Sequence, residues 1–190
     1  VLPLAWLYQE FTLGLRDLAS YERDHLNLDV RPVADAALKM ARREDELIFN
    51  GTEGMPGLMN VEGANRVKLS PWDEVGAAAN DMIQAITKLD EAGFHGPYTL
   101  ALAPQRYNLL FRLYGQRHHS ELEHLQQMVT DGIYKAPLLK EGGILISTGR
   151  YFASIILGQD MTLGFIGPAE TRMELNISES LALRIRRPDA

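Results

Sequence analysis

The segment from Tyr114 to His124, YGQRHHSELEH, concentrates side chains that could do chemistry. It holds three of the chain's five histidines and two glutamates. Zinc proteases place two histidines four positions apart on a helix, in the pattern His-Glu-x-x-His, with the glutamate as base. The order here is His-Ser-Glu-Leu-Glu-His, so His119 and Glu123 share a helix face without a third ligand. We therefore predict no metal site and no catalytic residue here, but a polar loop that leads into a helix.

The other patterns that could mark an active site are incomplete. Gly51, Gly54 and Gly57 are spaced as G-x-x-G-x-x-G, but no Lys-Ser or Lys-Thr pair follows and a helix is expected before them. Ser147 does not lie in a G-x-S-x-G elbow. Since the chain has no cysteine, thiol nucleophiles, zinc–thiolate sites and disulfides are excluded. We predict that the chain is not an enzyme, and its two-sided apolar strands favour an assembly protein.

The composition is that of a folded protein whose partners are neither nucleic acid nor membrane. The 190 residues are 46% hydrophobic and 23% charged, which is enough to bury a core. A net charge of −6 opposes binding to phosphates, and no apolar run reaches the length of about 18 residues that a membrane helix needs. Because the sequence opens within an expected strand and without Met, we expect it to be the C-terminal part of a longer protein.

Hydrophobic periodicity predicts a mixed order of helices and strands, and hence the α+β class. The run 2–13 has apolar residues in both alternating sets, which predicts a strand buried on both faces. The longest helix is expected over 32–49, with Pro32 in its first turn and Gly51 as its cap. Further helices are expected over 14–21, 70–92, 105–114 and 121–131, and further strands over 66–70, 96–104, 144–147, 152–160, 161–165 and 172–188.

Three acidic residues, Glu44, Asp45 and Glu46, stand near the end of the 32–49 helix, where the helix dipole disfavours negative charge. Glu44 also interrupts the apolar stripe of this helix. Two interpretations stay open. Arg42 and Glu46, four positions apart, indicate a salt-bridged helix face. Alternatively, the acids meet basic groups of another subunit, and we take all three as candidate inter-subunit contacts.

Four stretches in register resemble those of encapsulins, the bacterial and archaeal shell proteins with the HK97-type phage capsid fold. They are EDELIFNG after the long helix, GPYTLAL, ILGQDMTLGF and the alternating LNISESLALRI. Each is modestly specific alone, but their order and spacing match the family over essentially the whole chain. PLAWLYQEFTLGLRDLASYERD also resembles the strand that returns from the family's extended E-loop. The N-terminal helix and most of the E-loop expected from relatives are not in this sequence.

The resemblance implies a capsid-like architecture. It assigns residues 1–18 to the return strand of the E-loop, 19–66 to a P-domain with the spine helix, 67–154 to an A-domain and 155–190 to the return into the P-domain. It further implies a homo-oligomer, an icosahedral shell in the cytoplasm. The shell would enclose a cargo enzyme, such as a ferritin-like iron-storage protein or a peroxidase, bound through the cargo's C-terminal targeting peptide. The chemistry would belong to the cargo.

The resemblance also gives the opening histidines a place. In the family the corresponding A-domain loop lines the pore at the five-fold axis, through which small molecules enter. The pore-lining residues implied here are Gln116, Arg117, His118, His119 and Ser120. Because histidine changes charge near its ordinary pKa of about 6.5, we take a pore whose charge depends on pH as a hypothesis.

The resemblance implies a cargo groove as well, whose wall here is Gln159, Asp160 and Met161. Some encapsulins stack a flavin on a Trp and a Tyr, but those positions hold Arg16 and His119, so no cofactor is predicted. Two alternatives stay open. One is a phage major capsid protein of the same fold, and the remote one is an enzyme with a protease or bacteriocin label, which would need an acid/base set around His118, His119 and His124.

Overall fold

A computed structural model describes residues 2–114 and 119–190. It divides into two compact units. Unit 1 comprises the residues up to Met55 together with Ile155–Leu183, and unit 2 comprises Pro56–Ser154 together with Arg184–Ala190. Both units combine helices and strands, which confirms the α+β class. In the part of the chain that the structure describes, no helix is long and apolar enough to cross a membrane.

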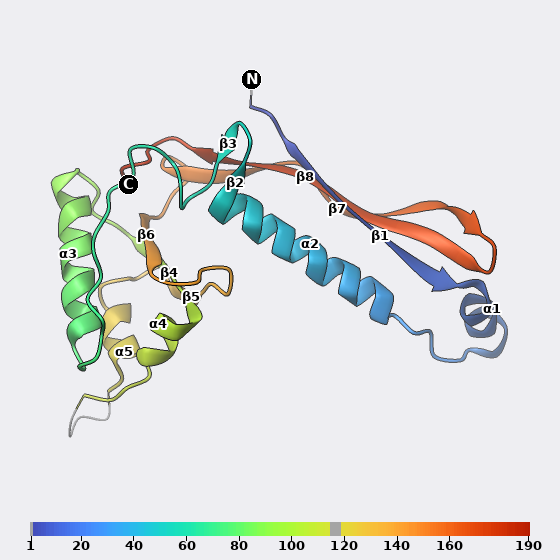
Figure 1. Cartoon of the computed structure of the whole chain (residues 1–190), viewed down its shortest axis with the longest axis horizontal. Helices are drawn as coiled ribbons and strands as arrows, with labels where there is room; N and C mark the ends of the chain where they lie inside the picture. Colours follow the sequence, from blue (N-terminus) through green and yellow to red (C-terminus); the bar gives the residue numbers. More distant parts are fainter. Residues whose placement is uncertain (1, 115–118) are drawn as a thin grey trace. The chain divides into compact units, whose positions relative to one another are not determined.

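Unit 1 is a helix on a three-stranded sheet (Figure 1). Its elements are β1 (Ala5–Gly14), α1 (Leu15–Asp24), α2 (Arg31–Asn50), the short strands β2 (Gly51–Thr52) and β3 (Met55–Pro56), and the long strands β7 (Ala153–Ala169) and β8 (Arg172–Ile185). The strand order is β1-β8-β7, so β1 and β7 are both edge strands. β1 and β8 are antiparallel, with Ala5 opposite Leu181 and Gly14 opposite Arg172.

The long helix forms where its sequence predicts. Pro32 lies in the first turn of α2, and Gly51 follows the helix with a φ of 69°, a value that favours glycine. Met40 is fully buried and packs with Phe11 of β1 and Ile177 of β8. Burial of this apolar stripe is what holds a 20-residue helix on the sheet, since helix propensity alone contributes little.

One expectation for the first strand is wrong. β1 is a strand, but in this chain only one of its faces is covered. Leu7, Phe11 and Leu13 face α2 and its core, whereas Trp6 on the opposite face is 67% exposed and contacts Tyr8 at a ring-centroid distance of 5.1 Å. A three-stranded sheet with one helix cannot cover both faces of its strands, which is why the two-sided pattern is only half satisfied.

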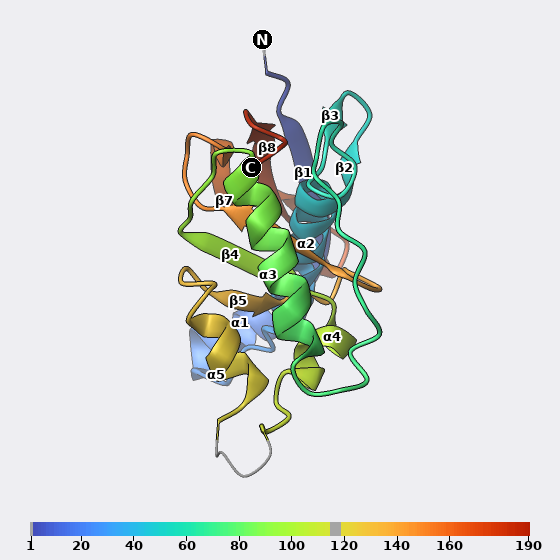
Figure 2. The ribbon, with the colours of Figure 1, turned by 90° about the vertical axis from the view of Figure 1, so that its left-hand side faces the viewer.

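Unit 2 is built on a second three-stranded sheet of order β5-β4-β6. Its elements are α3 (Ala77–Glu91), β4 (Tyr98–Leu102), α4 (Pro104–Leu109), α5 (Glu121–Gln126), β5 (Ile133–Lys135) and β6 (Gly143–Ser147). β4 pairs with β5 in parallel and with β6 antiparallel. Figure 2 turns α3 toward the reader; its Met82 and Leu89 belong to one core with Leu100 of β4 and Leu125 of α5.

The second helix begins later than its capping residues predict. Ser70 and Pro71 do not start it; α3 begins at Ala77. Instead, the Ser70 backbone N–H and hydroxyl and the Trp72 indole N–H all donate to Asp81 Oδ2, at 2.7, 3.0 and 2.7 Å. Trp72 has a φ of 62° and is 1% exposed, so its side chain enters the core where a helical turn was expected.

Other elements also differ in length from those expected from the sequence, because contacts with distant residues decide where a helix or strand ends. The helices expected over 105–114 and 121–131 are shorter, as α4 and α5. The segment 66–70 is not a strand, and the strands expected over 152–160 and 161–165 form one strand, β7. β5 was not expected from the sequence.

Candidate pore and assembly surfaces

The predicted pore loop is carried by a short antiparallel stem in unit 2. Leu113 pairs with Ser120 as an isolated bridge, and the Tyr114 N–H donates to the His119 carbonyl at 3.0 Å. The Glu121 N–H donates to the Arg112 carbonyl at 3.0 Å, which extends the stem towards its base. Of the predicted pore residues, His119 and Ser120 lie in this stem. Gln116, Arg117 and His118 lie outside the described residues.

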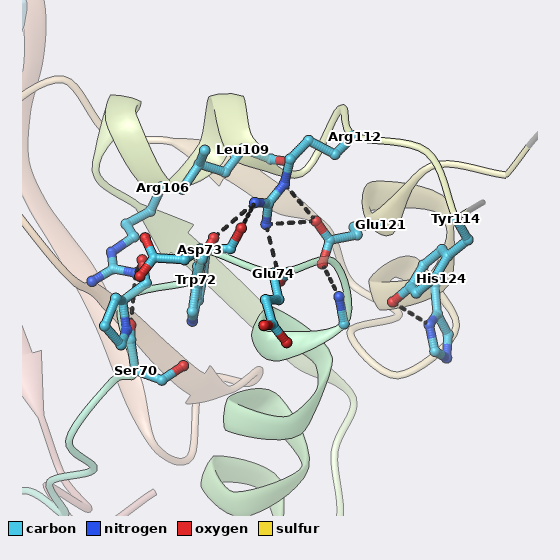
Figure 3. Close-up of polar contacts among 12 residues, drawn as sticks. Ser70, Trp72, Asp73, Glu74, Arg106, Leu109, Arg112, Tyr114, Glu121 and His124 are labelled. Carbon is cyan, nitrogen blue, oxygen red and sulfur yellow. Dashed lines mark hydrogen bonds and ion pairs between the residues drawn. The ribbon is translucent and has the colours of Figure 1, made fainter.

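An ion pair whose carboxylate is buried closes the base of the stem (Figure 3). The Arg112 guanidinium approaches Glu121 Oε2 through Nη2 at 2.9 Å and Nε at 3.1 Å. The Glu121 side chain is 1% exposed. Its other oxygen, Oε1, accepts the Gly76 backbone N–H at 2.7 Å, so both carboxylate oxygens have donors. Gly76 has a φ of 97°, which a residue with a Cβ rarely adopts.

Arg112 also fixes the segment that leads into α3. Its Nη1 donates to the carbonyl oxygens of Trp72 and Asp73 at 2.8 and 3.3 Å. Arg106 acts in parallel, donating to the Ser70 carbonyl at 2.8 Å while its guanidinium lies 4.8 Å from the Trp72 ring centroid. Two arginines thus replace the helical hydrogen bonds that this segment does not make, and they hold it beside the loop stem (Figure 3).

A capping box fixes the exit of the loop. The Ser120 hydroxyl accepts the Glu123 N–H at 3.2 Å, and the Glu123 carboxylate accepts the Ser120 N–H at 2.9 Å. His119 Nδ1 lies 3.4 Å from the Glu123 carboxylate. The hydrogen bond from the Ser120 backbone, and then His119, hold the pKa of Glu123 below its usual value. The sequence reasoning noted the His119–Glu123 spacing but missed the box.

The remaining histidine of the segment is engaged elsewhere. His124 Nδ1 lies 3.0 Å from the Tyr114 hydroxyl, with the two rings 5.4 Å apart, and burial raises the pKa of Tyr114. His119 and His124 therefore have different partners, Glu123 and Tyr114. Among the residues that the structure describes, no group of three His, Asp or Glu side chains is arranged to hold a metal ion.

The residues predicted for the cargo groove lie exposed on the edge strand β7 of unit 1. Gln159 donates to the Thr162 hydroxyl at 2.6 Å, and Asp160 accepts the Met161 N–H at 2.8 Å. Gln159 also donates to the Ser178 hydroxyl of β8 at 3.4 Å. All three contacts are exposed, so these side chains shape the sheet surface rather than a closed pocket. Met161 is 39% exposed.

The apolar face of β7 is a larger feature that the sequence reasoning missed. A Cβ added to Gly158 would lie 2.7 Å from the Ser180 hydroxyl, and one added to Gly164 would meet the Asn176 side chain. Ser180 and Asn176 alternate with the residues of β8 that face α2, so both glycines lie on the opposite side of the sheet. Their neighbours therefore lie on the α2 side: Leu157, Leu163 and Phe165, which are 52%, 60% and 63% exposed.

The three acids of α2 do not share one environment. Asp45 and Glu46 are exposed, as an inter-subunit contact requires. Glu44 is half-buried, because it lies in the same helix stripe as the buried Met40 and Leu47. That stripe faces β8, where Glu179 is 4% exposed, and burial followed by the charges of Glu44 and Asp160 raises the pKa of Glu179. The burial of Glu179 was not predicted from the sequence. The signal was present, because Glu179 alternates with Ile177 and Leu181 in one row of β8, and both of these are buried.

Comparison with known proteins assigns the family. The sequence profile of the family described as "Encapsulating protein for peroxidase" matches residues 1–182. The type 1 encapsulin shell protein EncA of Myxococcus xanthus is 35% identical over 187 residues, which cover 97% of this chain and 65% of that relative. The chain thus spans just under two thirds of the length of this relative.

Solved structures show the same fold. A virus-like particle from Pyrococcus furiosus superposes with a TM-score of 0.86 at 26% identity, covering 98% of this chain and 74% of that one. The capsid protein of Myoviridae phage XM1 superposes with a TM-score of 0.72 over 97% of this chain and 70% of its own, at 16% identity, which shows the fold alone. The predicted HK97-type capsid fold is therefore confirmed. The chain belongs to the encapsulin family of encapsulating shell proteins, with the HK97-type capsid fold.

Proposed function

We propose that this chain is part of a shell subunit that assembles with copies of itself into an icosahedral cage, which encloses a cargo enzyme and admits small molecules through pores. The observation that carries the proposal is the match to the encapsulating-protein family over residues 1–182, together with a capsid fold that covers at least 97% of the chain. Closed cages of identical subunits need extended shared interfaces rather than a catalytic pocket. We infer that the chain itself is not an enzyme.

Within this proposal, unit 1 contains most of the P-domain and unit 2 contains the A-domain, although residues 56–66 and 184–190 of the proposed P-domain belong to unit 2. The P-domain would comprise 19–66 and 155–190, with α2 as its spine helix, and the A-domain would comprise 67–154. Residues 1–18 would be the strand that returns from the E-loop. The support is that each unit has its own buried core, around Met40 in one and around Leu100 in the other.

The pore is assigned to residues 116–120. The Arg112–Glu121 pair closes the stem beneath this loop, and the Ser120 capping box fixes the start of α5 after it. Both ends of the loop are therefore held in place, as side chains that must meet around an axis require. His119 is exposed, with 75% of its side chain accessible, as a pore-lining residue requires. Protonation of His118 and His119 would add positive charge to the ring formed by the copies of the loop.

The cargo is proposed to bind through its C-terminal targeting peptide on β7. Gln159, Asp160 and Met161 would supply polar contacts and one thioether, and Leu157, Leu163 and Phe165 on the α2 side would supply apolar area. Exposed apolar patches of this kind mark interaction sites. The cargo would be a peroxidase, as the family description states, or a ferritin-like iron-storage protein, the other class that the resemblance implies.

Copies of the chain would also meet through the acids of α2. Asp45 and Glu46 are exposed and form no ion pair within the described residues, so their charges are available to basic groups of another subunit. Glu44, being half-buried, would contribute at the edge of such a contact. We place the assembled shell in the cytoplasm.

Electron microscopy of the full-length protein tests the proposal most directly. Purified protein should contain closed particles of uniform diameter. The double variant Asp45→Lys with Glu46→Lys should reduce their yield, whereas Glu91→Lys, an exposed acid at the end of α3, should not. Full-length protein that is folded but never forms closed particles would refute the shell.

A phage major capsid protein is the second candidate, because the XM1 capsid shares the fold. The two candidates differ in what the particle contains. A cargo shell should co-purify with one protein in fixed proportion, and nuclease treatment should leave the mass of the particle unchanged. A phage capsid should contain DNA.

A further inference from the structure

Glu179 is a buried carboxyl group in the interface between α2 and the sheet of unit 1. It stands in the row of β8 that faces α2, between Ile177 and Leu181, and it is 4% exposed. Its Oε2 atom is buried and has no hydrogen-bond partner among the described residues. A carboxylate buried in this way is costly in its ionised form, so such groups take up a proton instead.

The charged groups that face Glu179 come from two elements, and both are acids. Glu44 comes from α2, and Asp160 comes from β7. Both side chains are carboxyl groups, and their charge opposes a negative charge on Glu179. Their effects add to that of burial, which is the largest cause of the raised pKa of Glu179.

Among the described residues, no cationic side chain of the surrounding elements counteracts the effect of these acids on Glu179. β1 places the apolar Leu7 opposite Glu179. Arg43, which precedes Glu44 on α2, donates its Nη1 to the Tyr8 carbonyl at 2.6 Å. On β8 itself the neighbours in the same row are Ile177 and Leu181. A cationic side chain from another molecule could not reach Oε2 without displacing the unit's own atoms, because that atom is covered.

We propose that Glu179 holds its proton to higher pH in the folded chain than in the unfolded chain, and that loss of this proton as pH rises weakens the packing of α2 on the sheet. Ionisation would place a third negative charge beside Glu44 and Asp160 in a buried site. A carboxyl group whose pKa is higher in the folded than in the unfolded chain contributes its full stability below the unfolded pKa. That contribution is lost as pH rises through the folded pKa. Unit 1 is therefore held more firmly in mild acid than in alkali.

Unfolding of the full-length protein in urea tests this device. Glu179→Gln keeps the shape of the side chain but cannot ionise. Between about pH 5 and about pH 8, where an unperturbed glutamate is already ionised, the unfolding midpoint of the natural protein should fall and that of Glu179→Gln should fall less. Glu179→Gln should also be the more stable protein at the higher pH. Asp35→Asn, at an exposed position of the same helix, should keep the natural slope.

A spectroscopic measurement on the natural protein tests the proposal even if the Glu179→Gln variant does not fold. In protein with ¹³C-labelled glutamate, the carboxyl carbon of Glu179 should titrate above the ordinary glutamate range, at a position assigned by its absence in Glu179→Gln. If the variant does not fold, sequential assignment of the natural protein identifies the same signal. A Glu179 carboxyl that titrates at or below the ordinary range overturns the proposal, and so does an unchanged pH slope in Glu179→Gln. Neither result depends on whether the chain forms a shell.

Discussion

Arg112 and Glu121, nine positions apart, form an ion pair at 2.9 Å that closes the stem of the predicted pore loop, with the carboxylate buried and the guanidinium partly exposed. The pair also reaches α3, because Glu121 accepts the Gly76 N–H and Arg112 donates to the Trp72 carbonyl. One interaction therefore ties together the loop, the helix after it and the segment before α3. Such a pair fixes the relative positions of these segments more than it adds to net stability. Removal of one partner is nevertheless costly, because it leaves the other charge buried.

Replacement of Arg112 by Met should destabilise unit 2 by about 3–5 kcal/mol, because it leaves the Glu121 carboxylate buried without its cation. Equilibrium unfolding in urea measures the change. Arg23→Met is the matched control, since Arg23 forms an ion pair with Asp24 in which its side chain is 76% exposed, and no measurable loss is expected there. Equal losses in the two variants would mean that the Arg112–Glu121 pair has no special role.

Replacement of Ser120 by Ala should destabilise the fold by about 1 kcal/mol through loss of the capping box on α5.

The capping box also predicts that the stability of α5 depends on pH. Because the pKa of Glu123 is lower in the folded chain, its contribution is present above the unfolded value and is lost as pH falls through the folded value. Amide protection factors in α5, taken relative to the intrinsic exchange rate at each pH, should therefore fall below about pH 4. Glu123→Gln should remove that fall, and its persistence in the variant would contradict the role of this carboxylate.

Replacement of both His118 and His119 by Gln should remove any pH dependence of ion entry into assembled particles. Entry of a cation should slow as pH falls through about 6.5 in the natural shell, because protonated rings repel it, and it should be constant in the variant. Stopped-flow quenching of an enclosed dye measures entry. His95→Gln is the control, since His95 pairs with Asp90 away from the loop. An unchanged pH profile in the double variant would refute the gating hypothesis.

Replacement of Phe165 by Ser should weaken cargo binding on β7. Burial of an aromatic side chain contributes about 1.5–3 kcal/mol, so the Kd for a cargo peptide should rise by about ten- to a hundredfold. Fluorescence anisotropy with a labelled C-terminal peptide of the cargo gives the Kd. Tyr151→Ser removes an equally exposed aromatic from unit 2 and should leave the Kd unchanged. If both variants bind alike, the apolar face of β7 is not the cargo surface.

The sequence by itself determined the elements whose signals are local. Pro32, the apolar stripe through Met40 and the terminal Gly51 determine α2, because helix start, face and end are each encoded within a few residues of where they act. The alternation of β8 and the four family stretches likewise predicted the class and the capsid fold. The prediction that the histidine segment leads into a helix is confirmed, since α5 begins at Glu121.

Tertiary structure decided what depends on distant partners. Nothing near Ser70 reveals that Asp81 binds its N–H and delays α3 to Ala77, or that Trp72 turns into the core. Arg112 and Glu121 are indistinguishable from ordinary surface charges in the sequence, and only the stem brings them together and buries the Glu121 carboxylate. The charges of Glu44 and Glu179 were visible in the sequence, but their meeting across α2 and β8 depends on strand register and helix packing, which act over more than a hundred residues of chain.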